Sequence, residues 1–230
     1  MEIYVWRRYN MATFHSTARI FSIEGNIGTG KSTFLELLKD YFKDREDVCF
    51  LQEPVDIWLN CKDKEGSVLD HFYKDQRAYS FKFQMLAYIS RLSILRKALE
   101  NPKTQYIICE RCLFTDKHVF CKMLYDDGMI DDIGYQIYNM WFEEFNEYAH
   151  CTPIYMRCEP EVSYRRTLGR AREGETIPLA YLEKCHQYHE DWLKDAITVD
   201  ANIDKVKTTQ WIALFEQLIH KPAFAKEEQE

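Results

Sequence analysis

The stretch GNIGTGKS, residues 25–32, decides the fold class of this chain. It matches the phosphate-binding pattern G-x-x-x-x-G-K-(S/T), follows the apolar run Ile20–Ile23, and precedes apolar residues at helical spacing. Glycines let the backbone curl until successive N–H groups point inward, and the start of a helix adds partial positive charge. The stretch therefore predicts a nucleoside triphosphate site in which Lys31 reaches the β- and γ-phosphates and Ser32 ligates Mg²⁺. The flanking strand and helix disfavour the alternative, a glycine turn with a chance lysine.

Outward from this stretch, short apolar runs alternate with longer amphipathic segments. This rhythm is typical of a parallel sheet covered by helices, so we expect an α/β fold with a five-stranded parallel sheet and helices on both faces. The four further strands are expected at Val48–Leu51, Tyr106–Cys109, Pro153–Met156 and Ile197–Val199. Apolar spacing predicts helices within 34–42, 67–99, 116–125, 131–148 and 181–192.

The composition disfavours several classes of protein. The 230 residues contain 37 acidic and 30 basic side chains, and the formal net charge of -7 argues against broad binding of nucleic acid or anionic lipid. The eight cysteines are scattered, and the pair Cys109 and Cys112 lacks the partners that a zinc site needs. No apolar stretch approaches the ~18 residues that span a membrane. We therefore expect a soluble cytoplasmic protein with reduced thiols and without nucleic-acid or membrane partners.

The two ends of the chain are expected to lie outside the folded domain. Residues 1–18 are interpreted as a variable extension, 19–222 as one domain and 223–230 as a frayed, solvated tail. The extension holds several basic and hydroxyl side chains and a single acid, which also fits a mitochondrial transit peptide. Met11 is an alternative start.

Two acidic motifs follow predicted strands. Glu53 follows the strand 48–51 after Gln52, at the edge where open parallel sheets bind ligands. Glu110 and Arg111 end the run 106–109, and they lie beside the phosphate stretch if the first and third strands are neighbours. By position alone, Glu53 could be a solvated acid and Glu110–Arg111 a surface ion pair.

Taken in order, these motifs resemble one enzyme family. GNIGTGKS is followed by E-P-V-x-x-W at 53–58, by Glu110-Arg111, and by an arginine-rich segment before Ile177-Pro178-Leu179. This succession is similar to the deoxyribonucleoside kinase family, most of all to its deoxycytidine and deoxyguanosine kinase branch, and it covers about Ile20 to Trp192. The resemblance implies a P-loop kinase that uses ATP and Mg²⁺ to phosphorylate the 5′-hydroxyl of deoxynucleosides for nucleotide salvage.

The resemblance also implies catalytic and phosphate-binding residues. Glu53 would orient the hydroxyl or accept its proton, Arg111 and Lys31 would stabilise charge, and Glu110 would hold Mg²⁺ with Ser32. Cys112 stands where the family usually has serine, which leaves the hydrogen bonding there open. The expected phosphate-binding residues are Gly25, Asn26, Ile27, Gly28, Thr29, Gly30, Lys31, Ser32, Thr33, Arg166, Arg170 and Arg172.

Four arginines crowd into eight residues: Arg165, Arg166, Arg170 and Arg172. Guanidinium groups so close together repel one another unless an anion joins them. The run could be a solvated basic face or an RNA contact, and the acidic net charge disfavours the second. The resemblance implies a lid over the triphosphate at about 165–176, within which Glu173 or Glu175 would contact the sugar 3′-hydroxyl.

The expected base-recognition residues share a helix face. Gln84, Ala87 and Arg91 are spaced at i, i+3 and i+7, which alone would fit a solvent-facing polar stripe. The resemblance implies instead that Gln84 pairs with the base, and that Arg91 with Asp116 favours deoxycytidine and purine deoxynucleosides over thymidine. Phe83 and Phe120 would sandwich the base, and Tyr73 would meet the 3′-hydroxyl. The expected nucleoside-binding set is Ile27, Val55, Trp58, Tyr73, Phe83, Gln84, Ala87, Arg91, Arg111, Asp116, Phe120 and Glu173.

Two rival functions share part of this pattern. Nucleoside monophosphate kinases also have the phosphate stretch and an acid–proline turn, but usually with arginine before the acid, where this chain has Gln52. A nucleotide-sensing switch would leave the other motifs without a purpose, and no N-K-x-D motif occurs. Helices between the second and fourth strands are expected to form a homodimer, as in similar kinases.

Overall fold

A five-stranded parallel sheet forms the centre of the molecule. The computed structural model describes residues 18–170, 177–203 and 208–220. The strands are β1 (Arg19–Glu24), β2 (Val48–Leu51), β3 (Tyr106–Glu110), β4 (Thr152–Arg157) and β5 (Ile197–Asp200). They lie in the order β2-β3-β1-β4-β5, and each pairs in parallel with its neighbours. The predicted α/β fold and all five strand positions are confirmed.

Helices and short helical turns connect the strands. They are α1 (Lys31–Tyr41), α2 (Val55–Asn60), α3 (Val68–Lys74), α4 (Gln76–Leu99), α5 (Leu113–Thr115), the π-helix η1 (Asp116–Cys121), α6 (Lys122–Asp126), α7 (Asp132–Glu144), the 3₁₀-helix η2 (Asn146–Tyr148), α8 (Pro160–Arg170), α9 (Leu179–Trp192) and α10 (Thr208–His220). In the described part of the chain, no helix is both long and apolar enough to cross a membrane. Residues 1–17 of the expected extension and the expected tail, 223–230, lie outside the described residues.

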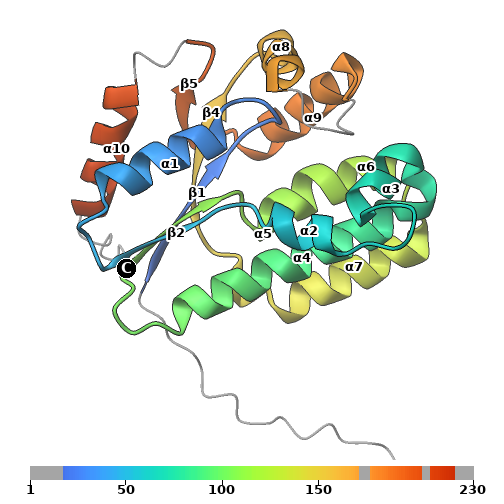
Figure 1. Ribbon diagram of the computed structural model, residues 1–230, viewed down its shortest axis with the longest axis horizontal. Helices are drawn as coiled ribbons and strands as arrows, with labels where there is room; N and C mark the ends of the chain where they lie inside the picture. Colours follow the sequence, from blue (N-terminus) through green and yellow to red (C-terminus); the bar gives the residue numbers. More distant parts are fainter. Residues whose placement is uncertain (1–17, 171–176, 204–207, 221–230) are drawn as a thin grey trace, which may run out of the picture.

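Helices cover both faces of the sheet, as expected (Figure 1). On one face, α1 and α10 pack Phe34 and Phe215 against Phe21 of β1, and the two phenylalanine rings of the helices meet edge-on at 5.6 Å. On the other face, α4 packs Leu95 against Ile107 of β3. Consecutive strand residues point to opposite faces, so a parallel strand covered on both sides must be apolar throughout.

The strand order brings the sequence motifs to one edge of the sheet. Because β3 pairs with β1, Ile23 lies opposite Glu110, and the turn after β3 lies beside the phosphate stretch. The sequence placed Glu110 and Arg111 beside the phosphate stretch if the first and third strands were neighbours, and they are. β2 pairs with the other side of β3, which brings Glu53 to the same carboxyl edge.

The long apolar segment 67–99 forms two helices instead of one. Asp75 interrupts it with an extended backbone (φ -146°, ψ 86°), and its side chain accepts a hydrogen bond from the Ala78 N–H at 3.1 Å, which caps α4. Ser67 caps α3 in the same way by accepting from the Asp70 N–H at 3.1 Å. A cap stabilises each helix start, so both helices keep their apolar faces on the core while the chain changes direction.

Other helices also differ from the prediction. The expected helix 116–125 is divided between η1 and α6, and α7 ends at Glu144, where the expected helix 131–148 gives way to η2. The sequence did not predict α2 or α10. The hydrogen bonds of a π-helix run from residue i to i+5, one residue further than in an α-helix, and η1 packs against α4, α7 and α9.

Candidate active site

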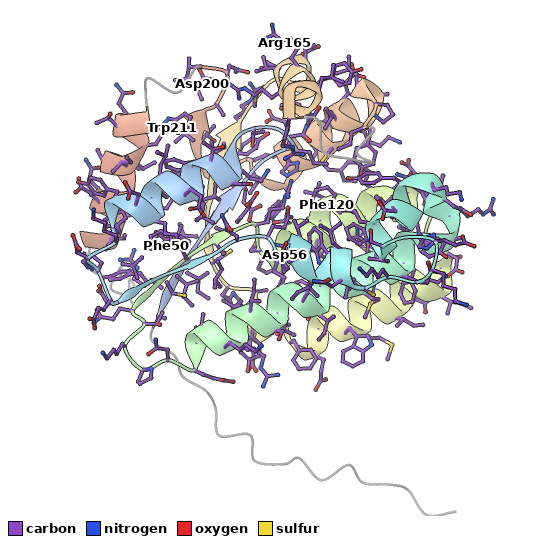
Figure 2. All side chains as sticks on the ribbon, viewed as in Figure 1. Phe50, Asp56, Phe120, Arg165, Asp200 and Trp211 are labelled. Atoms are coloured by element: carbon purple, nitrogen blue, oxygen red, sulfur yellow. The ribbon has the colours of Figure 1, made fainter. Side chains whose placement is uncertain are left out.

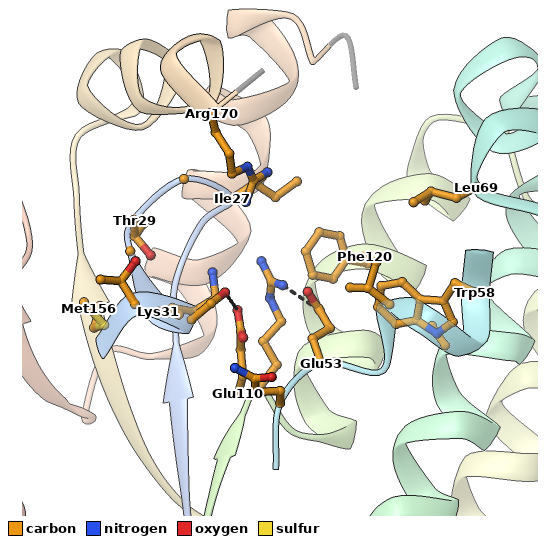
Figure 3. Close-up of a pocket in the computed structure, with 18 of the residues that line it drawn as sticks. Ile27, Thr29, Lys31, Glu53, Trp58, Leu69, Glu110, Phe120, Met156 and Arg170 are labelled. Atoms are coloured by element: carbon orange, nitrogen blue, oxygen red, sulfur yellow. Dashed lines mark hydrogen bonds and ion pairs between the residues drawn. The ribbon is translucent and has the colours of Figure 1, made fainter. Parts of the chain in front are cut away.

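A cavity of about 1330 Å³ lies at the carboxyl edge of the sheet. Pockets for a single drug-sized ligand measure ~300–1,000 Å³, so this cavity has room for two substrates. Figure 3 shows Thr29 and Lys31 of the phosphate stretch on one side, Trp58 and Phe120 on the other, and Glu53 between them. A phosphate-binding loop and an aromatic pocket therefore face each other across a carboxylate.

The phosphate stretch joins β1 to α1 in the predicted strand–loop–helix arrangement. Gly28 has a φ of 85°, and a Cβ atom there would lie 2.6 Å from the Ser163 carbonyl oxygen of α8, so only glycine fits. Residues 27–33 line the cavity. The amides of the loop and the start of α1 can therefore surround a phosphate group.

Gly25 and Asn26, which were also predicted to bind phosphate, do not line the cavity. The Asn26 side chain is turned away from it: Nδ2 donates to the Leu182 carbonyl of α9 at 2.8 Å, and Oδ1 accepts from the Ile27 N–H at 2.8 Å. The side chain of Asn26 thus fixes the loop against α9. Both polar atoms of this side chain already have protein partners, so the prediction that Asn26 binds phosphate rests on its backbone amide.

Lys31 lines the cavity although it is only 4% exposed. Its Nζ donates to the Asn26 carbonyl at 2.7 Å. Burial lowers the pKa of Lys31 to about 8, with Arg111 adding to the effect and Glu110 and Glu53 opposing it. A phosphate group beside Nζ would favour the charged form, so binding of a polyphosphate and protonation of Lys31 support each other.

Ser32 and Glu110 form a pair of oxygen donors next to Lys31. The Ser32 hydroxyl donates to Glu110 Oε1 at 2.9 Å. The described residues contain no group of three or more His, Cys, Asp or Glu side chains that could hold a metal ion. Mg²⁺ usually takes one or two protein oxygens and completes its shell with phosphates and water, so this pair fits the ion.

Glu53 is held by two arginines. Arg111 Nη1 donates to its Oε1 at 2.7 Å, and Arg91 Nη2 donates to the same oxygen at 3.1 Å. Burial alone would raise the pKa of Glu53, but the charges of Arg111, Arg91 and Lys31 outweigh it and lower the pKa to about 2. The carboxylate is therefore ionised at neutral pH, in contact with the cavity, and fixed in direction.

Arg91 and Asp116, singled out by the sequence, form a buried ion pair. Arg91 Nε donates to Asp116 Oδ2 at 2.9 Å, and both residues are less than 5% exposed. Arg91 Nη1 also donates to the Glu110 carbonyl at 2.8 Å. Burial opposes the charged form of Arg91, but Asp116 and Glu53 overcome this and raise its pKa. Arg91 thereby connects Asp116 to Glu53.

Gln84 lies on the same face of α4 as Arg91 and lines the cavity. It is 3% exposed, so the alternative of a solvent-facing polar stripe is wrong. Its Oε1 has no hydrogen-bond partner among the described residues. A buried acceptor without a partner is costly, and a donor group of a ligand in the cavity would satisfy it.

Aromatic side chains enclose this end of the cavity. Trp58 meets Phe83 edge-on with ring centroids 5.2 Å apart, and its Nε1 donates to Ser90 Oγ at 3.0 Å. Phe120 projects from η1 with Arg111 above its ring, 5.0 Å from the centroid. The remaining predicted nucleoside-binding residues that line the cavity are Ile27, Val55, Tyr73 and Ala87.

The arginines of α8 divide into two groups. Arg166 and Arg170 both line the cavity, as the resemblance implied, and Arg166 Nη1 donates to the Ala201 carbonyl at 2.7 Å. Arg165 is exposed and projects from the outer side of α8, away from the centre of the molecule (Figure 2). Arg172, Glu173 and Glu175 lie outside the described residues.

Comparison with known proteins identifies the family. A family model described as deoxynucleoside kinase matches residues 21–221. The chain belongs to the deoxynucleoside kinase family. The predicted family, fold and enzyme class are thereby confirmed, and the chain is an ATP-dependent kinase that phosphorylates deoxynucleosides.

Individual relatives of this deoxynucleoside kinase are similar over most of its length. A probable deoxycytidine kinase of fowlpox virus (strain NVSL) is 35% identical over 192 residues, which cover 82% of this chain and 77% of the relative. The deoxycytidine kinase of Bos taurus is 32% identical over 216 residues, 84% of this chain and 82% of the relative. A mitochondrial deoxyguanosine kinase of Xenopus laevis is 32% identical over 198 residues, 77% of this chain and 74% of the relative.

Several residues that line the cavity of this kinase were not predicted from its sequence. Tyr181 was interpreted only as a packing residue of a helix, but it faces the cavity from α9, and burial raises its pKa. Leu69 of α3 and Trp211 of α10 also reach the cavity. The sequence carries no local signal for these contacts, because they form only when α3, α9 and α10 pack around the cavity.

Proposed function

We propose that this kinase transfers the γ-phosphoryl group of ATP to the 5′-hydroxyl of deoxycytidine and of purine deoxynucleosides in preference to thymidine. The buried pair of Arg91 and Asp116 beside the unpartnered Gln84 carbonyl carries this proposal. Cytosine and adenine present exocyclic amino donors, which suit a carbonyl and a carboxylate acceptor. Thymine would instead bring a carbonyl and a methyl group to the same polar surface.

The phosphate end supports the donor part of the reaction. The amides of residues 27–33 and the Lys31 ammonium would bind the β- and γ-phosphates, and Ser32 and Glu110 would hold Mg²⁺. When bound, the ion supplies neutralisation of charge on the phosphate oxygens. Arg166 and Arg170 line this part of the cavity and would contact the transferred group, because a planar guanidinium binds two phosphoryl oxygens at once. Arg172 is proposed to join Arg166 and Arg170 in a lid over the triphosphate.

Glu53 is proposed to receive the acceptor hydroxyl. Its carboxylate lies between the two ends of the cavity, and Arg111 fixes its direction at 2.7 Å. Since its pKa is lowered to about 2, it serves mainly by aiming the hydroxyl oxygen at phosphorus, and it takes the proton only as the bond to phosphorus forms. Tyr73, with Glu173 or Glu175, is proposed to bind the sugar 3′-hydroxyl.

A competition assay tests the substrate proposal. Purified protein, ATP and Mg²⁺ are incubated with equal concentrations of deoxycytidine, deoxyadenosine, deoxyguanosine and thymidine, and the monophosphates are separated and quantified. We expect higher kcat/KM for at least one of the first three than for thymidine. Thymidine as the leading substrate would overturn the base preference. A parallel reaction offers the corresponding deoxynucleoside monophosphates as acceptors, and a preference for these would overturn the nucleoside proposal altogether.

We further propose that the kinase forms a homodimer through α7 and the adjoining part of α4. These helices pack against each other, and their outer face carries exposed apolar side chains. They are Ile89, Ile133, Ile137, Met140 and Trp141. The four residues of α7 are spaced at i, i+4, i+7 and i+8, which places them in one stripe. A second copy of the chain would cover this stripe together with Ile89 of α4.

The location and the domain limits are also proposals. All eight cysteines are free thiols, which supports a reducing compartment such as the cytoplasm. Residues 19–222 are proposed as the kinase domain. Phosphorylation of deoxynucleosides in that compartment would serve nucleotide salvage.

A further inference from the structure

The backbone of Arg111 is strained. Its φ is 61°, and Arg111 is the only residue other than glycine with a positive φ in the described part of the chain. An arginine adopts this left-handed conformation only where its surroundings hold it, and such residues gather at functional sites. The conformation has a consequence here, since Arg111 Nη1 donates to Glu53 at 2.7 Å.

Buried hydrogen bonds hold the chain on both sides of this residue. The Arg111 N–H donates to the Ile23 carbonyl of β1 at 3.1 Å. The next N–H, that of Cys112, donates to Thr115 Oγ1 at 3.1 Å. The Thr115 hydroxyl in turn donates to Glu24 Oε2 at 2.6 Å, and the side chains of Thr115 and Glu24 are both 0% exposed.

The thiol of Cys112 holds this turn less strongly than the Thr115 hydroxyl does. Its Sγ lies 3.7 Å from Thr115 Oγ1, and sulfur is a weak donor and a weak acceptor. The strong contact between the turn and the core therefore runs through the Thr115 hydroxyl, which accepts from the turn and donates to Glu24 at once. The hydrogen bonding around Cys112, which the sequence left open, is therefore made mainly by Thr115.

Glu24 is suited to be the fixed end of this chain of hydrogen bonds. It is the last residue of β1, directly before the phosphate stretch, and it is held in the middle of the sheet. Burial raises the pKa of Glu24 despite the hydrogen bond from Thr115, which favours a neutral acid. A glutamine would therefore mimic the side chain closely.

We propose that Thr115 and Glu24 are positioning residues that keep Arg111 in its left-handed conformation, so that its guanidinium group points at Glu53 during phosphoryl transfer. The inference rests on the proposed roles of Glu53 and Arg111. Neither Thr115 nor Glu24 needs to touch a substrate, because neither lines the cavity.

Steady-state kinetics of full-length variants test the inference. Thr115→Val removes the hydroxyl with little change in volume, and we expect kcat to fall between about tenfold and 100-fold, the range for a small misplacement of a catalytic group. KM for ATP and for the deoxynucleoside should stay within about twofold, since Arg111 acts on the transition state. Thr115→Ser keeps the hydroxyl and should restore kcat.

Matched variants separate positioning from stability. Thr104→Val changes another buried threonine, which lies before β3 at the opposite edge of the sheet from Arg111, and should leave kcat unchanged even if it lowers the melting temperature. Glu24→Leu should lower kcat as Thr115→Val does, Glu24→Gln should largely preserve it, and the double variant Thr115→Val/Glu24→Leu should fall no further than either single change.

The outcomes distinguish the inference from the proposed function. Parental kcat in folded Thr115→Val, or equal losses in Thr115→Val and Thr104→Val, would overturn the positioning role. If Thr115→Val does not fold, the contrast between Glu24→Leu and Glu24→Gln gives the same decision. A parent protein that phosphorylates no deoxynucleoside would instead refute the proposed function.

Discussion

Two arginines meet one carboxylate oxygen in the candidate active site, and this contact lowers the pKa of the carboxylate. Arg111 and Arg91 both donate to Glu53 Oε1 and more than offset the cost of burying the charge. Lys31 experiences the opposite balance, because its burial and the nearby Arg111 outweigh the acids around it. The two groups therefore titrate in well-separated ranges, and substitutions and pH can test each one separately.

Replacing Glu53 with glutamine should lower kcat by ~100-fold or more, the range for loss of a positioned general base. The affinity for ATP should change much less than kcat, because Glu53 acts on the phosphate stretch only through its charge, which raises the pKa of Lys31. Single-turnover rates and ATP binding measured on the same preparation check this. Near-normal turnover of Glu53→Gln would remove the proposed role.

The affinity for ATP should fall as the pH rises through about 8. Lys31 has its pKa lowered to about 8 in the folded protein, and bound phosphate favours its charged form, so the neutral form that accumulates above this pH binds ATP less well. The measurement is the dissociation constant of a non-hydrolysable ATP analogue at pH values from about 6.5 to 9.5, a range around that pKa. Lys31→Arg should show a flatter profile, because arginine stays charged. Equal slopes for the two proteins would contradict the assignment.

The base preference should shift when the buried pair is made apolar. The double variant Arg91→Met/Asp116→Ala avoids leaving one buried charge alone. We expect the ratio of kcat/KM for thymidine to that for deoxycytidine to rise about tenfold or more, although both values fall because Arg91 also supports Glu53. Arg77→Met, an exposed arginine on the same helix, is the control and should leave the ratio unchanged.

The elements around the phosphate stretch are packed closely enough to fix its shape. The loop lies against the backbone of α8 at Gly28, and Asn26 connects it to α9. These two helices precede and follow residues 171–176. The loop that would bind phosphate therefore packs against the helix that carries Arg166 and Arg170. The loop, α8 and α9 form one packed unit.

Gly28→Ala should weaken this unit. A Cβ atom would lie 2.6 Å from the Ser163 carbonyl, and the φ of 85° is unfavourable for alanine, so we expect lower stability and weaker ATP binding. Gly169→Ala in α8 meets nothing within 4 Å and should raise stability by about 0.5–1 kcal/mol. Thermal unfolding and ATP titration of both variants check this. A Gly28→Ala protein as stable as its parent would show that the loop can relax.

At the scale of the whole molecule, the outer face of α7 is an exposed apolar surface among the described residues. Most large apolar side chains of the described residues are buried in cores on the two faces of the sheet and around α4 and α7. The outer face of α7 is different, since Ile133 is 70% and Met140 is 73% exposed. Neighbouring apolar side chains in such a stripe mark a contact surface more often than a solvent face.

A charged residue in this stripe should therefore produce a monomer. We expect Met140→Glu to lower the mass measured by light scattering from that of a dimer to that of one chain. Leu168→Glu introduces the same charge at a residue of α8 that is 62% exposed, outside the stripe, and should leave the mass unchanged. A parent protein that is monomeric at all concentrations, or a dimeric Met140→Glu, would refute the proposed interface.

The sequence by itself determined the fold class, the five strands and most of the residues around the cavity. These features are local or periodic: a loop with glycines at fixed spacing, apolar runs of strand length, and motifs that directly follow strands. Even the pairing of Arg91 with Asp116 followed from a resemblance carried by such motifs. These features can be found from residues that are close together in the sequence, so no knowledge of long-range contacts was needed to predict them.

Only the tertiary structure decided how these residues act on one another. The strand order brought Glu110 beside the phosphate stretch, and packing turned Asn26 toward α9 and Tyr181 toward the cavity. The pKa values of Glu53 and Lys31 depend on charges that are distant in the chain and on burial. The hydrogen bond from Thr115 to Glu24, beside the strained Arg111, joins residues 91 positions apart. Burial and close contact arise only when the chain folds, so no local pattern predicts them.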